Sequence, residues 1–126
     1  MKNEYMRPAA EVSLPVVAGT KSGDPVRVGA FRGVAATGAG EGGNPTGNAT
    51  VVTDHRSYLY EVEGAIGGPG TPVYLIPRNG GTAPRLSVTA QTAPNDVPWG
   101  YTVPKVGESG QRAGTSGVAV VRPAQV

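Results

Sequence analysis

Residues 54–57 are where catalytic chemistry could lie, because Asp54, His55 and Ser57 supply an acid, a base and a hydroxyl close together. His55 is the single histidine of the chain. Successive side chains on a strand point to opposite faces, and a catalytic triad depends on geometry rather than on order in the chain. We therefore interpret this segment as a polar turn between two strands and predict that the protein is not an enzyme. A small hydrolase built around His55 stays an alternative, which would require a pocket and an acid from another strand.

Metal and cofactor sites have little support in the composition. The chain has no cysteine and one histidine, so only scattered carboxylates remain as ligands, and we expect no metal. Residues 38–43 match the pattern G-x-G-x-x-G, but a dinucleotide site needs this pattern to open a helix. Here the residues Asn44-Pro45-Thr46-Gly47 follow instead. We expect no bound cofactor.

Charge and hydropathy also limit the classes of partner. Eleven Lys and Arg residues stand against nine Asp and Glu, for a net charge of +2, and they are scattered along the chain. This pattern does not favour nucleic-acid binding. No run approaches the ~20 apolar residues of a membrane helix, and the first residues lack the apolar stretch of a signal peptide. We expect no membrane partner and a protein that is soluble where it is made.

The elements that must position any site are predicted to be strands. The chain contains 20 Gly and 12 Pro, which interrupt every candidate helix, while Val-rich runs with alternating polarity recur between them. The fold class is therefore all-β, as a small single-domain β-barrel or β-sandwich. Strands are expected near residues 11–17, 24–29, 31–37, 48–53, 57–63, 71–77, 86–89, 99–103 and 117–122.

The predicted organisation is an extended N-terminal arm over residues 1–10 and a single β-domain over residues 11–126. The arm shows neither strand nor helix periodicity. Residues 38–47 carry almost no side chain that could pack and are predicted to form a mobile, Gly-rich surface loop. Pro25 and Pro72 each follow a glycine turn and are expected to begin a strand. This short internal similarity indicates two similar hairpin modules. Pro15 indicates a sheet edge or a bulge.

The aromatic residues have two readings, as part of the core or as a platform for stacking bases or sugars. With one Trp and one Phe in the chain, we favour a role in the core and in subunit contacts. The residues concerned are Tyr58, Tyr60, Tyr74, Trp99 and Tyr101.

Several short motifs together resemble the capsid decoration proteins of tailed bacteriophages, which are also called head-stabilising or cement proteins. The similarity covers most of the chain. It departs from the family pattern in the enlarged 38–47 loop and at 100–102, where a second Gly-Val-Ala would be expected. The segments that carry it are 1–5, 14–16, 18–20, 22–29, 33–35, 60–65, 72–74, 99–101 and 117–122.

This resemblance implies a structural virion protein without catalysis. It would bind the outer surface of an expanded phage capsid, with the major capsid protein as partner, and staple neighbouring capsid subunits to stabilise the head. It would also bind itself, as a homotrimer. In the arm, Lys2, Tyr5, Met6 and Arg7 are the candidate capsid or subunit contacts. The alternative function is a phage fibre or surface module that binds a receptor or glycan through loops 38–47 and 64–70.

Overall fold

A computed structural model describes residues 11–53, 56–105 and 107–124 of the chain. Over these residues the protein is built from strands and contains no helix, so the predicted all-β class is confirmed. The predicted arm and its candidate contacts Lys2, Tyr5, Met6 and Arg7 lie outside the described residues, and so does His55.

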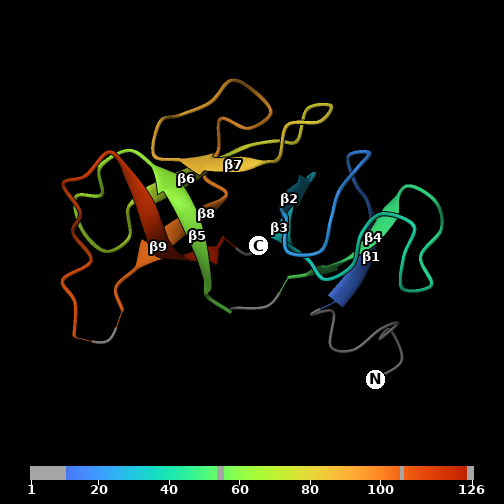
Figure 1. The fold of residues 1–126 in the computed structure, drawn as a ribbon, viewed down its shortest axis with the longest axis horizontal. Helices are drawn as coiled ribbons and strands as arrows, with labels where there is room; N and C mark the ends of the chain where they lie inside the picture. Colours follow the sequence, from blue (N-terminus) through green and yellow to red (C-terminus); the bar gives the residue numbers. More distant parts are fainter. Residues whose placement is uncertain (1–10, 54–55, 106, 125–126) are drawn as a thin grey trace.

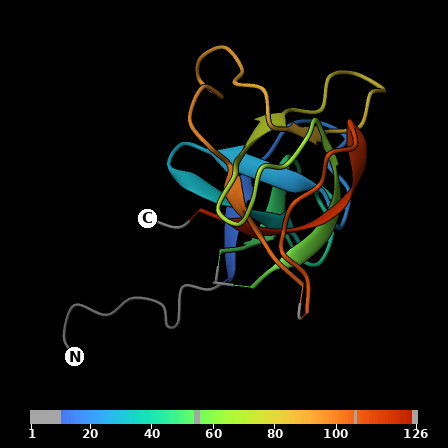
Figure 2. The same ribbon diagram turned by 90° about the vertical axis from the view of Figure 1, so that its left-hand side faces the viewer.

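The strands form two sheets (Figures 1 and 2). The first is an antiparallel four-stranded sheet with the order β1-β4-β3-β2. The second is a closed five-stranded barrel with the order β5-β7-β6-β8-β9. The strands are β1 (Glu11–Pro15), β2 (Pro25–Val28), β3 (Phe31–Ala35), β4 (Asn48–Val52), β5 (Tyr58–Glu63), β6 (Pro72–Ile76), β7 (Arg85–Ser87), β8 (Gly100–Val103) and β9 (Ser116–Pro123).

The prolines lie where a missing backbone donor is tolerated. Pro15 ends β1 and Pro25 begins β2, and these two strands are the edges of the four-stranded sheet. Pro72 begins β6 in the barrel. Both proline-opened strands are therefore present, but they belong to different sheets.

The barrel is closed by one parallel pair among antiparallel ones. β5 pairs with β7 in parallel, with Val62 opposite Leu86. On its other side β5 runs antiparallel to β9, and β8 joins β9 to β6. The loop before β9 is tied to the end of β5 because the guanidinium of Arg112 donates to the carbonyl oxygens of Val62, Gly64 and Gly117 at 2.5–2.6 Å.

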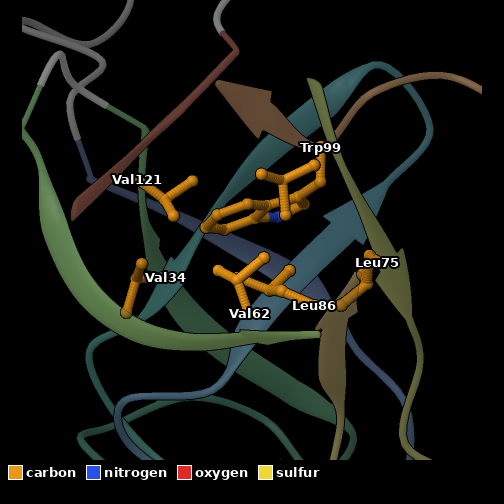
Figure 3. Packing of buried hydrophobic residues seen from close by; sticks show 7 residues of the cluster. Val34, Val62, Leu75, Leu86, Trp99 and Val121 are labelled. Atoms are coloured by element: carbon orange, nitrogen blue, oxygen red, sulfur yellow. The ribbon is translucent and has the colours of Figure 1, made fainter. Parts of the chain in front are cut away.

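The main hydrophobic core lies inside the barrel and surrounds Trp99, which has no exposed surface (Figure 3). Tyr60 packs against it with its ring edge-to-face to the indole, at a centroid distance of 5.9 Å. Val34 of β3 belongs to the same cluster, so the four-stranded sheet contributes to the barrel core. A second cluster, formed by Leu14, Val26, Ala35 and Val51, lies within the four-stranded sheet.

Two aromatic residues depart from the expected core role. Tyr101 is 42% exposed, and Tyr74 is half-buried, because both lie on the barrel face that points away from the core. The core interpretation therefore holds for Trp99, with Tyr58 and Tyr60 packed against its cluster.

Loop 38–47 is organised around one side chain. The amide nitrogen Nδ2 of Asn44 donates to Glu41 O at 2.7 Å, to Thr50 Oγ1 at 3.0 Å and to Thr37 Oγ1 at 3.3 Å. The Ser13 hydroxyl donates to Asn44 Oδ1 at 2.5 Å. This Gly-rich segment is thus held against β1 and β4 by a polar network.

Candidate functional site

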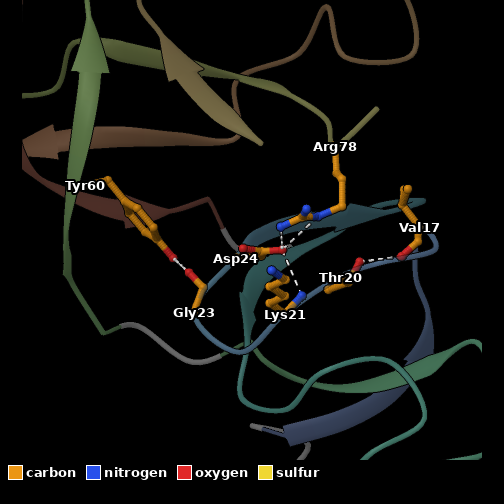
Figure 4. Close-up of polar contacts among 7 residues, drawn as sticks. All are labelled: Val17, Thr20, Lys21, Gly23, Asp24, Tyr60 and Arg78. Atoms are coloured by element: carbon orange, nitrogen blue, oxygen red, sulfur yellow. Dashed lines mark hydrogen bonds and ion pairs between the residues drawn. The ribbon is translucent and has the colours of Figure 1, made fainter. Parts of the chain in front are cut away.

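The seam between the four-stranded sheet and the barrel is held by three polar contacts, and Figure 4 shows those made by Tyr60 and Arg78. The Tyr60 hydroxyl of β5 donates to the carbonyl oxygen of Gly23 at 2.6 Å. Arg78 lies just after β6, and its guanidinium donates to Asp24 Oδ2 from Nη2 at 2.8 Å and from Nε at 3.3 Å. Deep in the core, Trp99 Nε1 donates to Val26 O at 2.9 Å. All three contacts fix β2 and the turn before it to the barrel.

The turn that carries Asp24 is built by local hydrogen bonds. Asp24 Oδ2 also accepts from the backbone N–H of Lys21 at 2.9 Å, so one carboxylate oxygen serves both the turn and the barrel. The Thr20 hydroxyl donates to Val17 O at 2.5 Å. Gly23, with φ of +92°, adopts the left-handed conformation that the turn requires. The local hydrogen bonds of the turn therefore fix the position of the Asp24 carboxylate that binds Arg78.

The electrostatics of the seam keep the Tyr60 hydroxyl protonated. Burial raises the pKa of Tyr60 above its ordinary value, and the nearby Tyr58 and Asp24 raise it further. A protonated phenol can donate to the Gly23 carbonyl, whereas a phenolate could not. This contact is consequently a stable part of the fold at neutral pH.

A cleft of about 430 Å³ opens beside this seam. β2 contributes to its wall together with the segments that follow β1 and β6. Five prolines of the described residues line the cleft. Because proline cannot donate a backbone hydrogen bond, they make the wall apolar and poor in hydrogen-bond donors. The prolines that line the cleft are Pro15, Pro25, Pro77, Pro84 and Pro94.

The charge of the cleft comes from Asp24, Arg27 and Arg78. Asp24 and Arg78 neutralise each other, with side chains that are 15% and 9% exposed. Arg27 is half-buried, and within the described part of the chain its buried Nε has no hydrogen-bond acceptor. Arg27 also lies directly opposite Arg32 in the β2–β3 pair, where like charges are destabilising. The cleft is therefore an apolar groove with one uncompensated positive charge, suited to a carboxylate on an apolar partner.

Sequence reasoning did not single out this cleft. A signal for part of it is present, because the short β2–β3 connection forces Arg27 and Arg32 into register. The approach of Arg78, 54 positions after Asp24, has no local signal. The predicted contacts Lys2, Tyr5, Met6 and Arg7 cannot be related to the cleft, since they lie outside the described residues.

Residues 11–53, 56–105 and 107–124, which the structure describes, contain neither a cluster of metal ligands nor a membrane-spanning helix. In these ranges no three His, Cys, Asp or Glu side chains gather as metal ligands would. In the same ranges no helix has the length and apolar character needed to span a bilayer. No protein-family model matches the chain, and no curated protein or solved structure matches it either.

Proposed function

We propose that this protein decorates the outer surface of an expanded phage capsid, where it staples neighbouring major capsid subunits and stabilises the head. The observation that carries the proposal is the apolar cleft with its uncompensated Arg27. Such a groove is suited to a segment of another protein. The motif resemblance over most of the chain supports the choice of a capsid as that protein.

The cleft has the properties of a docking groove for a chain segment. Its volume is within the range of about 300–1,000 Å³ that is common for binding sites. A carboxylate from the capsid would compensate Arg27, because an arginine fork binds carboxylates with two parallel hydrogen bonds. Stapling does not require strong single contacts, since many copies on a repeating lattice gain stability through multivalency.

The proposed role needs no catalysis, cofactor or metal. In it, the protein is made in the host cytoplasm and ends on the outer surface of the virion, with the major capsid protein as its partner. The arm contacts Lys2, Tyr5, Met6 and Arg7 remain part of the proposal, as does a homotrimeric state. An extended arm can add a strand to a partner's sheet edge, which would supplement docking in the cleft.

The test is co-sedimentation of the purified protein with matched expanded heads that lack it. We expect saturable binding at a fixed ratio to the major capsid protein, weakened by deletion of residues 1–7 and by Arg27→Glu. Lys105→Glu makes the same charge change at an exposed loop position away from the cleft and should bind like the wild type. Binding of Arg27→Glu equal to wild type would remove the cleft from the proposal.

Absence of binding to heads would overturn the decoration role. The fibre or receptor-binding alternative would then be tested, although loops 38–47 and 64–70 contain no aromatic residue that could stack on a sugar.

A further inference from the structure

The outer face of the barrel carries a continuous apolar surface across three strands. In the sheet register Leu59 of β5 lies opposite Val120 of β9, and Val120 lies opposite Val103 of β8. Directly opposite residues share a face, so these three side chains form one row. Val118 and Tyr101 extend the row to either side along the strands. These five residues are named here the outer face.

Three of the five apolar side chains of the outer face are exposed to solvent. Leu59 is 63% exposed, Val118 is 54% exposed and Tyr101 is 42% exposed. Scattered surface apolar residues are ordinary, but contiguous apolar patches mark interaction sites. Because the barrel is closed, the patch is presented by a sheet face rather than by an unpaired edge.

The sequence of β9 has the pattern of a strand that is covered on both sides. Residues 118–121 read Val-Ala-Val-Val without an intervening polar residue. Strands with one solvated face alternate apolar and polar residues, whereas strands buried on both faces form continuous apolar runs. Val121 is fully buried in the barrel core, and Ala119 packs against that core. Val118 and Val120 therefore face the other side of the barrel wall, where the described residues leave Val118 exposed and Val120 half-buried.

The charges beside the outer face indicate what covers it. Glu61 lies opposite Val118 on one side of the central row, and Arg122 lies opposite Tyr101 on the other side. Within the described part of the chain, neither has an ion-pair partner. Glu63, the next residue of β5 on this side, is paired with Arg85. Glu61 and Arg122 are therefore an unpaired acid and an unpaired base on opposite sides of the apolar row.

This arrangement is complementary to itself. A two-fold axis that runs along the Leu59–Val120–Val103 row would pack the row of one copy on the row of the other. The same rotation brings the Glu61 side of one copy over the Arg122 side of the other. The two side chains would then be offset by one strand spacing, about 4.8 Å, which a long arginine side chain can span. Each dimer would gain two such pairs.

We propose that the outer face is an isologous interface with a second copy of this chain. Two-fold interfaces use one self-complementary patch on both subunits, and sheets pack face to face at about 10 Å. A partner of one charge sign would leave Glu61 or Arg122 unpaired, whereas a second copy pairs both. The proposal does not depend on the decoration role, because it concerns the protein alone in solution. For the protein in solution it replaces the homotrimer that the motif resemblance implies with a two-fold dimer.

The first test is sedimentation velocity of the full chain without capsids, over about 1 µM to 1 mM, the range in which weak dimers dissociate. The wild type should shift from monomer to dimer with rising concentration. Leu59→Glu should stay monomeric, and Val97→Glu, a comparable change at an exposed loop position, should behave like the wild type. Far-UV circular dichroism checks that each variant is folded. A wild type that stays monomeric throughout, or that forms trimers, would overturn the two-fold interface.

The second test uses the charges and leaves the apolar row intact. Glu61→Arg and Arg122→Glu should each weaken self-association at least tenfold, because each variant brings like charges together across the axis. A mixture of the two single variants should restore the dimer as a heterodimer, and so should the double variant. Loss of association without restoration in the mixture would contradict the proposed pairing.

Discussion

The indole of Trp99 links the two sheets, and its replacement tests their packing most directly. Its Nε1–H donates to the carbonyl oxygen of Val26 at 2.9 Å, across 73 positions of sequence. The ring has no exposed surface and packs edge-to-face against Tyr60. Trp99→Phe keeps an aromatic ring but removes the donor and part of the buried volume.

The expected cost follows from these two losses. The hydrogen bond contributes about 1 kcal/mol to the free energy of unfolding. Phenylalanine lacks two of the buried ring carbons, each worth about 0.8 kcal/mol, and the cavity that remains adds to this cost. We expect Trp99→Phe to lower the free energy of unfolding by about 3 kcal/mol. For a chain of this length the thermal midpoint should fall by about 10 °C.

The assay is urea unfolding followed by far-UV circular dichroism, because Trp99 is the only tryptophan and its replacement removes the fluorescence signal. Incorporation of benzothienylalanine, which keeps the ring shape but has no N–H, should cost about 1 kcal/mol. Tyr74→Phe is the control and should change little, since within the described residues the Tyr74 hydroxyl makes no hydrogen bond. A loss below about 1 kcal/mol for Trp99→Phe, with an unchanged denaturant slope, would refute this account of the packing.

Three further predictions concern the seam and the close packing of the backbone. A double-mutant cycle with Asp24→Asn and Arg78→Met, measured by urea unfolding, should give a coupling of about 2 kcal/mol, because the pair is mostly buried; a value near zero would contradict its role. Above pH ~10 the unfolded chain loses the phenol proton that folded Tyr60 retains, so stability should fall as pH rises. Tyr60→Phe has no phenol at this position to titrate, so the difference in free energy of unfolding between wild type and variant should become smaller at alkaline pH. A difference that stays constant with pH would contradict this prediction. Gly33→Ala should cost about 2–3 kcal/mol, since its methyl group would overlap the backbone carbonyl of β4, whereas Gly67→Ala meets open space and should be nearly neutral by the same measurement.

The strands were predictable because their signals are local. Alternating valines indicate β2 and a pair of consecutive valines lies in β4, and glycine turns separate these strands from their neighbours. Pro15 indicated an edge or a bulge, and β1 is an edge strand. Each of these inferences needs only a few neighbouring residues.

The arrangement of the strands was not predictable, because it depends on contacts between distant segments. The parallel pairing of β5 with β7 places residues 24 positions apart side by side, with Val62 opposite Leu86. The division into a barrel and a separate sheet depends on contacts such as Trp99 to Val26. Neither leaves a pattern in a short window of sequence.

The Gly-rich loop shows a different limit of sequence reasoning. Its composition predicts mobility but gives no indication that Asn44 links the loop to Thr37, Thr50 and Ser13. A single polar side chain can satisfy several backbone and hydroxyl groups at once, and composition alone does not reveal that.

The candidate site was predictable only in part. Once the β2–β3 hairpin is accepted, its short turn places Arg27 opposite Arg32, and this register concentrates positive charge at one point. The apolar walls of the cleft come from both sheets, so the site exists only after the seam between them has formed. The charge could therefore be inferred from sequence, but the groove could not.

The two proposed surfaces differ in charge, and this difference assigns them to different partners. The outer face balances Glu61 against Arg122 and is complementary to itself, whereas the cleft retains the uncompensated Arg27 and requires a carboxylate from elsewhere. Because the cleft does not include outer-face residues, a dimer would leave both of its clefts unblocked by the interface itself. A dimer that presents two clefts to a repeating lattice would bind far more tightly than either cleft alone, because the second contact is intramolecular. Self-association would then strengthen the proposed stapling without any new contact to the capsid.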